Sequence, residues 1–165
     1  AVGGEILFIE TMLTKGKGNI KITGQLGDVM KESVDIALSL VKSMYPEKSE
    51  VFEKNDIHIH VPAGAVPKDG PSAGITMTTA IASLLNNIPV SPEYAMTGEV
   101  SLRGRVMPIG GLPEKLMAAA RAGIKKVFIP EENKDDLKEV AEEVLDELEI
   151  IPVKKVEDVL GIVLK

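Results

Sequence analysis

Residues 65–87, AVPKDGPSAGITMTTAIASLLNN, change character partway along. The first part is broken by proline and glycine, which is typical of a turn, and the second part is apolar enough for a buried helix. A single hydroxyl, that of Ser72, stands at the junction. Three roles fit a serine at such a place: a helix cap, part of a phosphate-binding loop, or a nucleophile.

The composition of the whole chain bounds these roles. Its 165 residues are 44% hydrophobic and 27% charged, with a net charge of −6, which suits one compact domain with a real core. The negative charge gives no general attraction to nucleic acid or to anionic membranes. Cysteine is absent, which excludes disulfides and thiolate sites. We expect neither a membrane span nor a signal peptide, and the start at Ala1 suggests a piece of a longer chain.

Hydrophobic periodicity predicts an α+β fold, a single compact domain over residues 1–165 with mixed β-sheets and packed helices. Helices are expected at residues 26–45, 72–87, 112–123, 131–148 and 156–164. Separate strands are expected at residues 55–62, 125–130 and 150–155. Two hairpins are predicted, one joining strands 3–13 and 18–24 through the turn TKGKG, and one over residues 94–111.

The local surroundings of Ser72 fit two of its three roles. Pro71 suits the first turn of a helix, which would place Ser72 at or next to the helix N-terminus. Backbone N–H groups are unpaired there and could hold an oxyanion if a carbonyl were attacked at Ser72. The alternative is that Ser72 simply caps the helix.

A nucleophilic serine needs a base, and no Ser–His–Asp pattern is evident. His58 and His60 are two residues apart on a strand, so they share one face. Two ligands make a poor metal site. We interpret both histidines as strand residues with one polar contact each, and the alternative is that they support the catalytic residues from nearby.

Lys115 is the other candidate base. It follows Gly110-Gly111-Leu112-Pro113 and opens the unusually apolar helix LMAAARAG. A lysine held there against the core would be partly desolvated, which would lower its pKa. The alternative is that its ammonium group simply reaches water from the helix start.

Long segments of the chain closely resemble the proteolytic domain of the ATP-dependent Lon protease, of the bacterial type. They are HIHVPAGAVPKDGPSAGITM (58–77), AMTGEVSLRGRVMPIGGLPEKLMAAARAGIKKVFIP (95–130) and ENKDDL (132–137). Near the start, GEILFIET and TGQLGDVMKES also match, so the resemblance covers essentially the whole chain.

This resemblance implies a serine endopeptidase with a Ser–Lys dyad. Ser72 matches the family nucleophile, Lys115 the family lysine, and Thr97 the threonine that hydrogen-bonds that lysine. The oxyanion is then expected at backbone N–H groups around Gly70 and Ala73. The segment EILFIET is expected to pair with an extended substrate, and the family favours an apolar pocket for Leu, Met or Phe.

The carboxylate of Asp69 would oppose this mechanism if it lay close to Lys115. A carboxylate close to Lys115 would raise the pKa of the lysine and keep it charged. We therefore hypothesise that the loop at residues 68–70 has an active and an inactive arrangement. Faster peptide cleavage by Asp69→Ala at neutral pH would support this hypothesis, and unchanged or slower cleavage would count against it.

The resemblance also implies partners. The substrates would be unfolded or damaged proteins, and the assembly a homohexameric ring in the bacterial cytoplasm. ATP and Mg would serve an ATPase domain outside this sequence, which contains no G-x-x-x-x-G-K-[ST] loop. The N-terminal domain of the family is expected to lie outside it too. We expect no cofactor, metal, membrane or nucleic acid to bind this domain.

Two other interpretations stay open. The glycine-bearing loop before an apolar helix also resembles the nucleotide loop of small-molecule kinases, which hold phosphates at a helix N-terminus. Here Asp69 would repel a phosphate, and no carboxylate site for magnesium is evident. The chain could also be a non-catalytic module for ring assembly, in which the Ser72 hydroxyl would not react.

Overall fold

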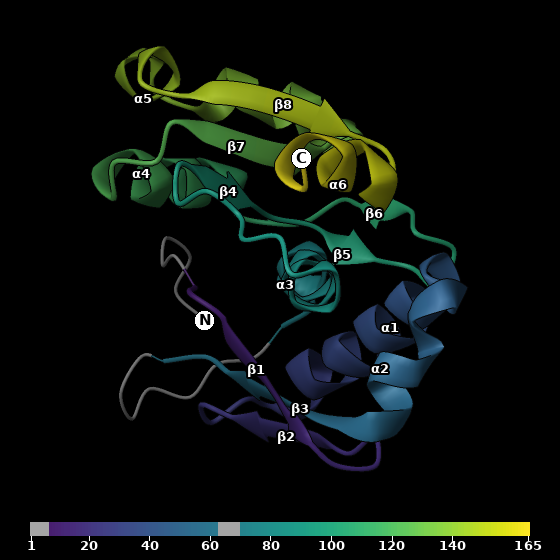
Figure 1. Ribbon diagram of the computed structural model, residues 1–165. Helices are drawn as coiled ribbons and strands as arrows, with labels where there is room; N and C mark the ends of the chain where they lie inside the picture. The colour runs from purple at the N-terminus through teal and green to yellow at the C-terminus, as the bar shows by residue number, and fades with distance from the viewer. Residues whose placement is uncertain (1–6, 63–69) are drawn as a thin grey trace.

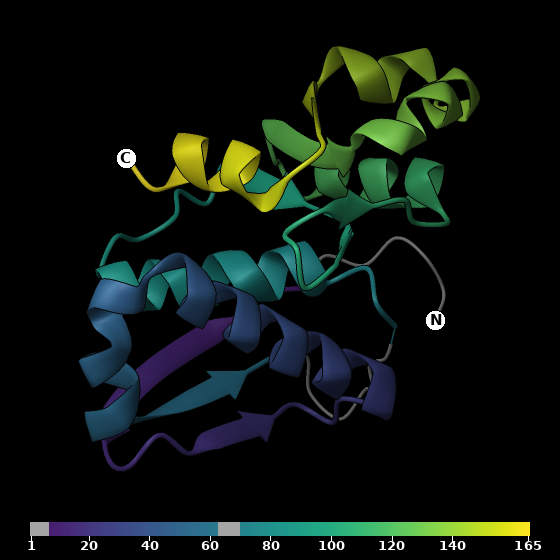
Figure 2. The ribbon, with the colours of Figure 1, turned by 90° about the vertical axis from the view of Figure 1, so that its right-hand side faces the viewer.

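The computed structural model describes residues 7–62 and 70–165, which form a mixed α+β domain, as the sequence predicts. A long central helix, α3 (Gly74–Asn86), lies between a lower and an upper layer (Figure 1). The lower layer holds the first sheet and α1 (Asp28–Met44), and the upper layer holds the second sheet (Figure 2). Both helices were predicted, with bounds that differ by one to two residues.

The first sheet contains β1 (Glu10–Lys15), β2 (Ile20–Thr23) and β3 (Asn55–His60), in the order β1-β3-β2. β1 is antiparallel to β3, and β2 is parallel to it. The predicted hairpin between the first two strands is therefore wrong, because β3 lies between them.

Hydrogen bonds of the glycine-rich link explain this arrangement. The amides of Gly16 and Gly18 donate to the carbonyls of Lys54 and Asn55, and the Asp56 carboxylate accepts from the amides of Lys17 and Asn19. The link is thus fastened to the start of β3 rather than closed on itself, and β3, whose Ile57 and Ile59 are buried, takes the centre.

The second sheet is parallel, in the order β4-β7-β8, and contains β4 (Tyr94–Met96), β7 (Lys126–Pro130) and β8 (Glu149–Val153). Helices α4 (Leu112–Arg121) and α6 (Val156–Val163) accompany it (Figure 1). The hairpin predicted over residues 94–111 is only partly right. Its hydrogen-bonded part is β5 (Glu99–Val100) with β6 (Val106–Met107), whereas β4 pairs with β7.

The charged segment at residues 131–148 is not the single helix that its pattern predicts. A 3-10 helix, η2 (Glu131–Glu139), and a short α5 (Glu142–Asp146) are separated by extended backbone at Val140. The helical spacing of apolar residues is present, but tertiary contacts override it. Val140 is buried in a core cluster, and the Asn133 side chain fastens the segment to the backbone of Ile109.

The described residues form two hydrophobic clusters. The larger one gathers α1, α3, α6 and the first sheet around residues such as Val34, Ile59 and Met77. It also takes in Phe52 of α2 (Ser49–Lys54), which follows a 3-10 turn, η1 (Pro46–Lys48). The smaller cluster joins α4 to β7 and the charged segment through Leu116, Ile129 and their neighbours. Within the described part of the chain, no helix is long and apolar enough to cross a membrane.

Candidate active site

A cavity of about 460 Å³ runs beside α3, and the three family-matched residues Ser72, Thr97 and Lys115 all line it. They come from three different segments: the turn before α3, the position just after β4 and the first turn of α4. Residues 7–9 and 11, from the start of the first sheet, form another wall. The fold thus brings together Ser72, Thr97 and Lys115, which span 43 positions of the sequence (115 − 72).

Ser72 lies in a turn one residue ahead of the α3 N-cap, which is Ala73. Among the described residues no side-chain hydrogen bond caps this helix, and its N-cap is Ala73, so the interpretation of Ser72 as a helix cap is wrong. Pro71 also lies before the helix rather than in its first turn. The backbone holds the turn instead: the Ser72 carbonyl accepts from the Gly98 amide at 2.8 Å, and the Gly98 carbonyl accepts from the Ile75 amide at 3.0 Å.

Thr97 follows β4 and is 8% exposed. Its amide donates to the carbonyl of Phe128 at 3.1 Å, which continues the pairing of β4 with β7. The next residue, Gly98, has no room for a side chain, because an added Cβ would lie 2.6 Å from Cγ1 of Val106. The second sheet therefore fixes the segment that carries Thr97 and holds Ser72.

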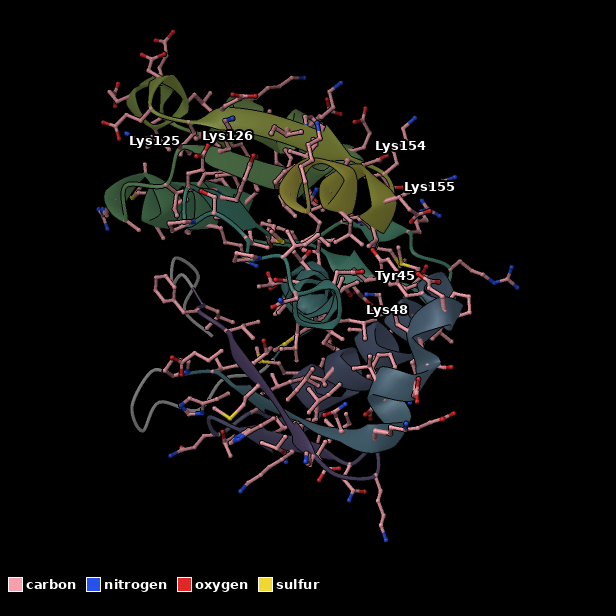
Figure 3. All side chains as sticks on the ribbon, in the orientation of Figure 1. Tyr45, Lys48, Lys125, Lys126, Lys154 and Lys155 are labelled. Atoms are coloured by element: carbon pink, nitrogen blue, oxygen red, sulfur yellow. The ribbon has the colours of Figure 1, made fainter. Side chains whose placement is uncertain are left out.

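Lys115 belongs to the first turn of α4, where Pro113 also lies, as the sequence predicts. The N-cap of this helix is Gly111 with φ of 73°, a conformation that favours glycine. Burial lowers the pKa of Lys115 below its usual value of 10.5. The ion pairs between described residues do not include Lys115. Unlike the partly buried Lys115, Lys125 and Lys154 are exposed at the rim of the molecule (Figure 3).

Asn133 is a supporting residue that the sequence analysis missed. Its side-chain oxygen accepts from the Ile109 amide at 3.0 Å, and its side-chain nitrogen donates to the Ile109 carbonyl at 2.8 Å. This pair of bonds anchors the backbone just before Gly110, Gly111 and α4. The sequence shows Asn133 only as an uncharged polar residue within a charged segment, and this does not indicate which backbone groups its side chain binds.

The remaining candidates lie apart or at the cavity wall. His58 and His60 do share a face, and both contact the hydroxyl of Thr23, at 2.9 and 2.6 Å. No group of three or more metal-ligating side chains occurs among the residues described. Ala73 is buried and lines the cavity, and Gly70 is half-buried before Pro71. Asp69 lies outside the described residues.

Comparisons with known proteins identify the family of the chain. A family model described as the Lon protease (S16) C-terminal proteolytic domain matches residues 1–165. The chain is 61% identical over 160 residues to a Lon protease of Clostridium beijerinckii, covering 97% of this chain and 20% of that protein. It is 53% identical over 167 residues to a Lon protease of Geobacter metallireducens, covering 99% of this chain and 20% of that protein.

A third relative, a Lon protease of Methanosphaera stadtmanae, is 58% identical over 161 residues, which cover 96% of this chain and 20% of that protein. The chain therefore spans about a fifth of the length of the curated relatives it matches. Because the family model matches from the first residue to the last, and these relatives share more than half of the aligned residues, the chain belongs to the Lon protease (S16) C-terminal proteolytic domain family.

Proposed function

We propose that this chain is a serine endopeptidase in which Ser72 is the nucleophile and Lys115 is the general base. One observation carries the proposal: Ser72 and Lys115 line the same cavity, and burial lowers the pKa of Lys115. A lowered pKa increases the fraction of neutral lysine, the only form that can accept a proton. The absence of an ion pair at Lys115 among the described residues acts in the same direction.

The reaction has two halves. The Ser72 hydroxyl oxygen attacks the peptide carbonyl carbon while the neutral Lys115 amine takes the hydroxyl proton. The tetrahedral intermediate collapses as the Lys115 ammonium returns that proton to the leaving amine, which releases the first product and leaves an ester on Ser72. Water then attacks the ester, again with Lys115 as the base, and frees the second product.

Backbone amides beside Ser72 are suited to hold the oxyanion. Within the described part of the chain, the amides of Gly74 and Ile75 are occupied by the carbonyls of Pro71 and Gly98, whereas those of Ser72 and Ala73 have no backbone acceptor. Free N–H groups beside the nucleophile can stabilise the negative charge that develops on the attacked oxygen. We therefore assign the oxyanion site to the amides of Ser72 and Ala73.

The edge of the first sheet offers a place for the substrate backbone. β1 is one of the two outer strands in the order β1-β3-β2, and residues 7–9, just before it, line the cavity with Ser72. An extended peptide can add to such an edge through main-chain hydrogen bonds. We propose that the scissile bond lies between that edge and the turn at Ser72.

The wider setting is also a proposal. The relatives are Lon proteases about five times as long as this chain, since it covers 20% of each. We propose that this domain works in a homohexameric ring in the bacterial cytoplasm on unfolded or damaged proteins. An ATPase domain elsewhere in the protein would use ATP and Mg to deliver them. Thr97 would orient the Lys115 amine, as a third group orients the base in a triad.

Acylation by a serine-reactive peptide analogue, read by intact mass, tests the proposal. Ser83→Ala is a matched control, because Ser83 lines the same cavity while its hydroxyl is bonded to the Ile88 carbonyl. We expect a single adduct on the unaltered chain and on Ser83→Ala, none on Ser72→Ala, and slower formation on Lys115→Ala. An adduct that persists in Ser72→Ala would contradict the proposal, because another residue would then be the one that reacts. No adduct on any form would also contradict it and would favour a non-catalytic assembly role.

A further inference from the structure

A short link between β6 and α4 leads the chain to Lys115. It comprises residues 108–111, of which Ile109 is half-buried and the other three are exposed. Within the described part of the chain, the amides of this link donate to no backbone carbonyl. Two of its residues, Gly110 and Gly111, are glycines, and Gly111 adopts a φ of 73° as the N-cap of α4. The backbone of the link therefore does not fix the start of α4 by itself.

The Asn133 side chain supplies the hydrogen bonds that the link lacks. Its oxygen accepts from the Ile109 amide at 3.0 Å, and its nitrogen donates to the Ile109 carbonyl at 2.8 Å. The same nitrogen donates its second hydrogen to the Asp136 carboxylate at 2.7 Å, so all three bonds agree on which end of the amide is the oxygen. Because Asn133 is only 2% exposed, water has little access to replace these bonds.

The link determines where the Lys115 amine lies. Lys115 follows Ile109 by six residues and belongs to the first turn of α4. Leu112 and Leu116, on the same helix, are buried in the smaller hydrophobic cluster, so packing holds one face of α4. The first turn is held in addition through the link. A displaced helix start would change both the position of the amine in the cavity and its burial, and burial is what lowers the pKa of Lys115.

We propose that Asn133 is a positioning residue for the reaction, whose two bonds to Ile109 hold the Lys115 amine in its place in the cavity. Asn133 does not line that cavity, so it acts through the backbone of the link and contacts no reacting atom. The inference rests on the proposed peptidase function and adds to it a residue outside the Ser–Lys dyad.

The chemistry of the amide explains why an asparagine suits this position. Its acceptor and donor pair with the N–H and the C=O of one residue, much as a neighbouring strand would. Alanine offers neither group and leaves both backbone groups without these partners. A misplacement of about 1 Å that originates far from the chemistry can cost about a hundredfold in rate. We therefore expect Asn133→Ala to slow acylation of Ser72 by roughly tenfold to a hundredfold.

The test compares Asn133→Ala with Val140→Ala. Val140 is the matched control, because it lies in the same charged segment and is buried in the same cluster, but its apolar side chain does not bond to the link. Both variants should lower the Tm. Two rates are measured across pH: acylation of Ser72 by the serine-reactive peptide analogue, and acetylation of the Lys115 amine by acetic anhydride, read by peptide mass. The exposed Lys125 is the internal reference for acetylation.

The two variants should differ in both rates. In Asn133→Ala we expect the pH of half-maximal Lys115 acetylation to rise toward 10.5, because the amine becomes better hydrated, and acylation of Ser72 to slow as stated. In Val140→Ala both should match the unaltered chain. Unchanged rates in Asn133→Ala would overturn this inference, and so would equal changes in Val140→Ala at an equal loss of Tm, since the role of Asn133 would then be structural only.

Failure of the proposed function gives a different result. It would show as no adduct on Ser72 in the unaltered chain. Acetylation of Lys115 does not require a reactive Ser72, so it still reports whether Asn133 holds the amine in place. A pH midpoint that is the same in Asn133→Ala and in the unaltered chain would overturn the positioning role in that case as well.

Discussion

The carbonyl of Ser72 and the amide of Gly98 are joined by a hydrogen bond of 2.8 Å. The carbonyl of Gly98 in turn accepts from the Ile75 amide, so the turn before α3 and the strand end at Thr97 are tied together from both sides. The position of Ser72 is therefore set by a neighbouring backbone segment, and within residues 7–62 and 70–165 no side-chain cap of the helix contributes to it.

Gly98→Ala should disturb this tie. The added methyl group would lie 2.6 Å from Cγ1 of Val106, so the segment must move. Overpacking of this kind costs about 1–3 kcal/mol of unfolding free energy, and we expect acylation of Ser72 to slow as well. Urea denaturation and intact-mass kinetics measure the two effects. Acylation at the unaltered rate in a destabilised variant would show that the tie does not position Ser72.

The acylation rate should depend on pH through Lys115. Only neutral Lys115 can act as the base, so the rate should rise with pH and level off above the pKa of this lysine. Because burial lowers that pKa, the midpoint should fall below the usual lysine value of 10.5. The second-order rate constant for the peptide analogue, measured across pH, gives the midpoint. A rate that does not change with pH would argue against a lysine base.

Lys115→Met should stabilise the fold at neutral pH. Burial disfavours the charged lysine, so the unfolded chain binds this proton more tightly and stability rises with pH between the folded and unfolded pKa values. The cost is fully present below the folded pKa and disappears above the unfolded pKa, and methionine avoids it at every pH. Denaturation should show a higher unfolding free energy for Lys115→Met at pH 7 and a smaller gain near pH 10. The exposed Lys125→Met serves as the neutral control.

Thr97→Val should slow acylation without unfolding the domain. Thr97 lines the cavity with Lys115, and its backbone bond to Phe128 does not depend on the side chain. Loss of one orienting hydroxyl corresponds to about tenfold to a hundredfold in rate. Thr97→Ser keeps the hydroxyl and should recover most of the rate. If Thr97→Ser were as slow as Thr97→Val, the methyl group rather than the hydroxyl would be the important part.

Asn133→Ala should lower stability by about 1–3 kcal/mol for the backbone groups left without partners. Both the amide and the carbonyl of Ile109 bond to the Asn133 side chain. Asn133→Asp keeps the acceptor for the amide but no longer donates to the carbonyl, so its effect should be intermediate. Thermal and urea unfolding measure the series. Equal stability of all three forms would mean that solvent replaces these bonds at no cost.

Four helices of this fold, α1, α3, α4 and α6, could be predicted from sequence, because apolar spacing and proline or glycine boundaries are local signals. The single helix predicted over residues 131–148 is wrong, and α2 was not predicted. α1, α3 and α4 lie close to their expected ranges. Strand partners are not local. β1 pairs with β3 rather than with β2 because Asp56 and the carbonyls of Lys54 and Asn55 bind the backbone amides of the loop between β1 and β2. Hydrophobic periodicity does not indicate these hydrogen bonds.

The candidate site shows the same division. The sequence indicates Ser72 and Lys115 as candidates because each lies near a helix start that a proline signals. Thr97 has no such mark, and only the family resemblance indicates it. Asn133 is beyond both approaches, since its role depends on a contact with the distant Ile109.

The two hydrophobic clusters have a consequence for heat tolerance. Ala73 belongs to the larger cluster, and Leu116, next to Lys115, belongs to the smaller one. A smaller cooperative unit can open at a lower free energy than the whole domain. Warming would then separate the base from the nucleophile while most of the chain stays folded, so that inactivation comes before melting and reverses fully on cooling.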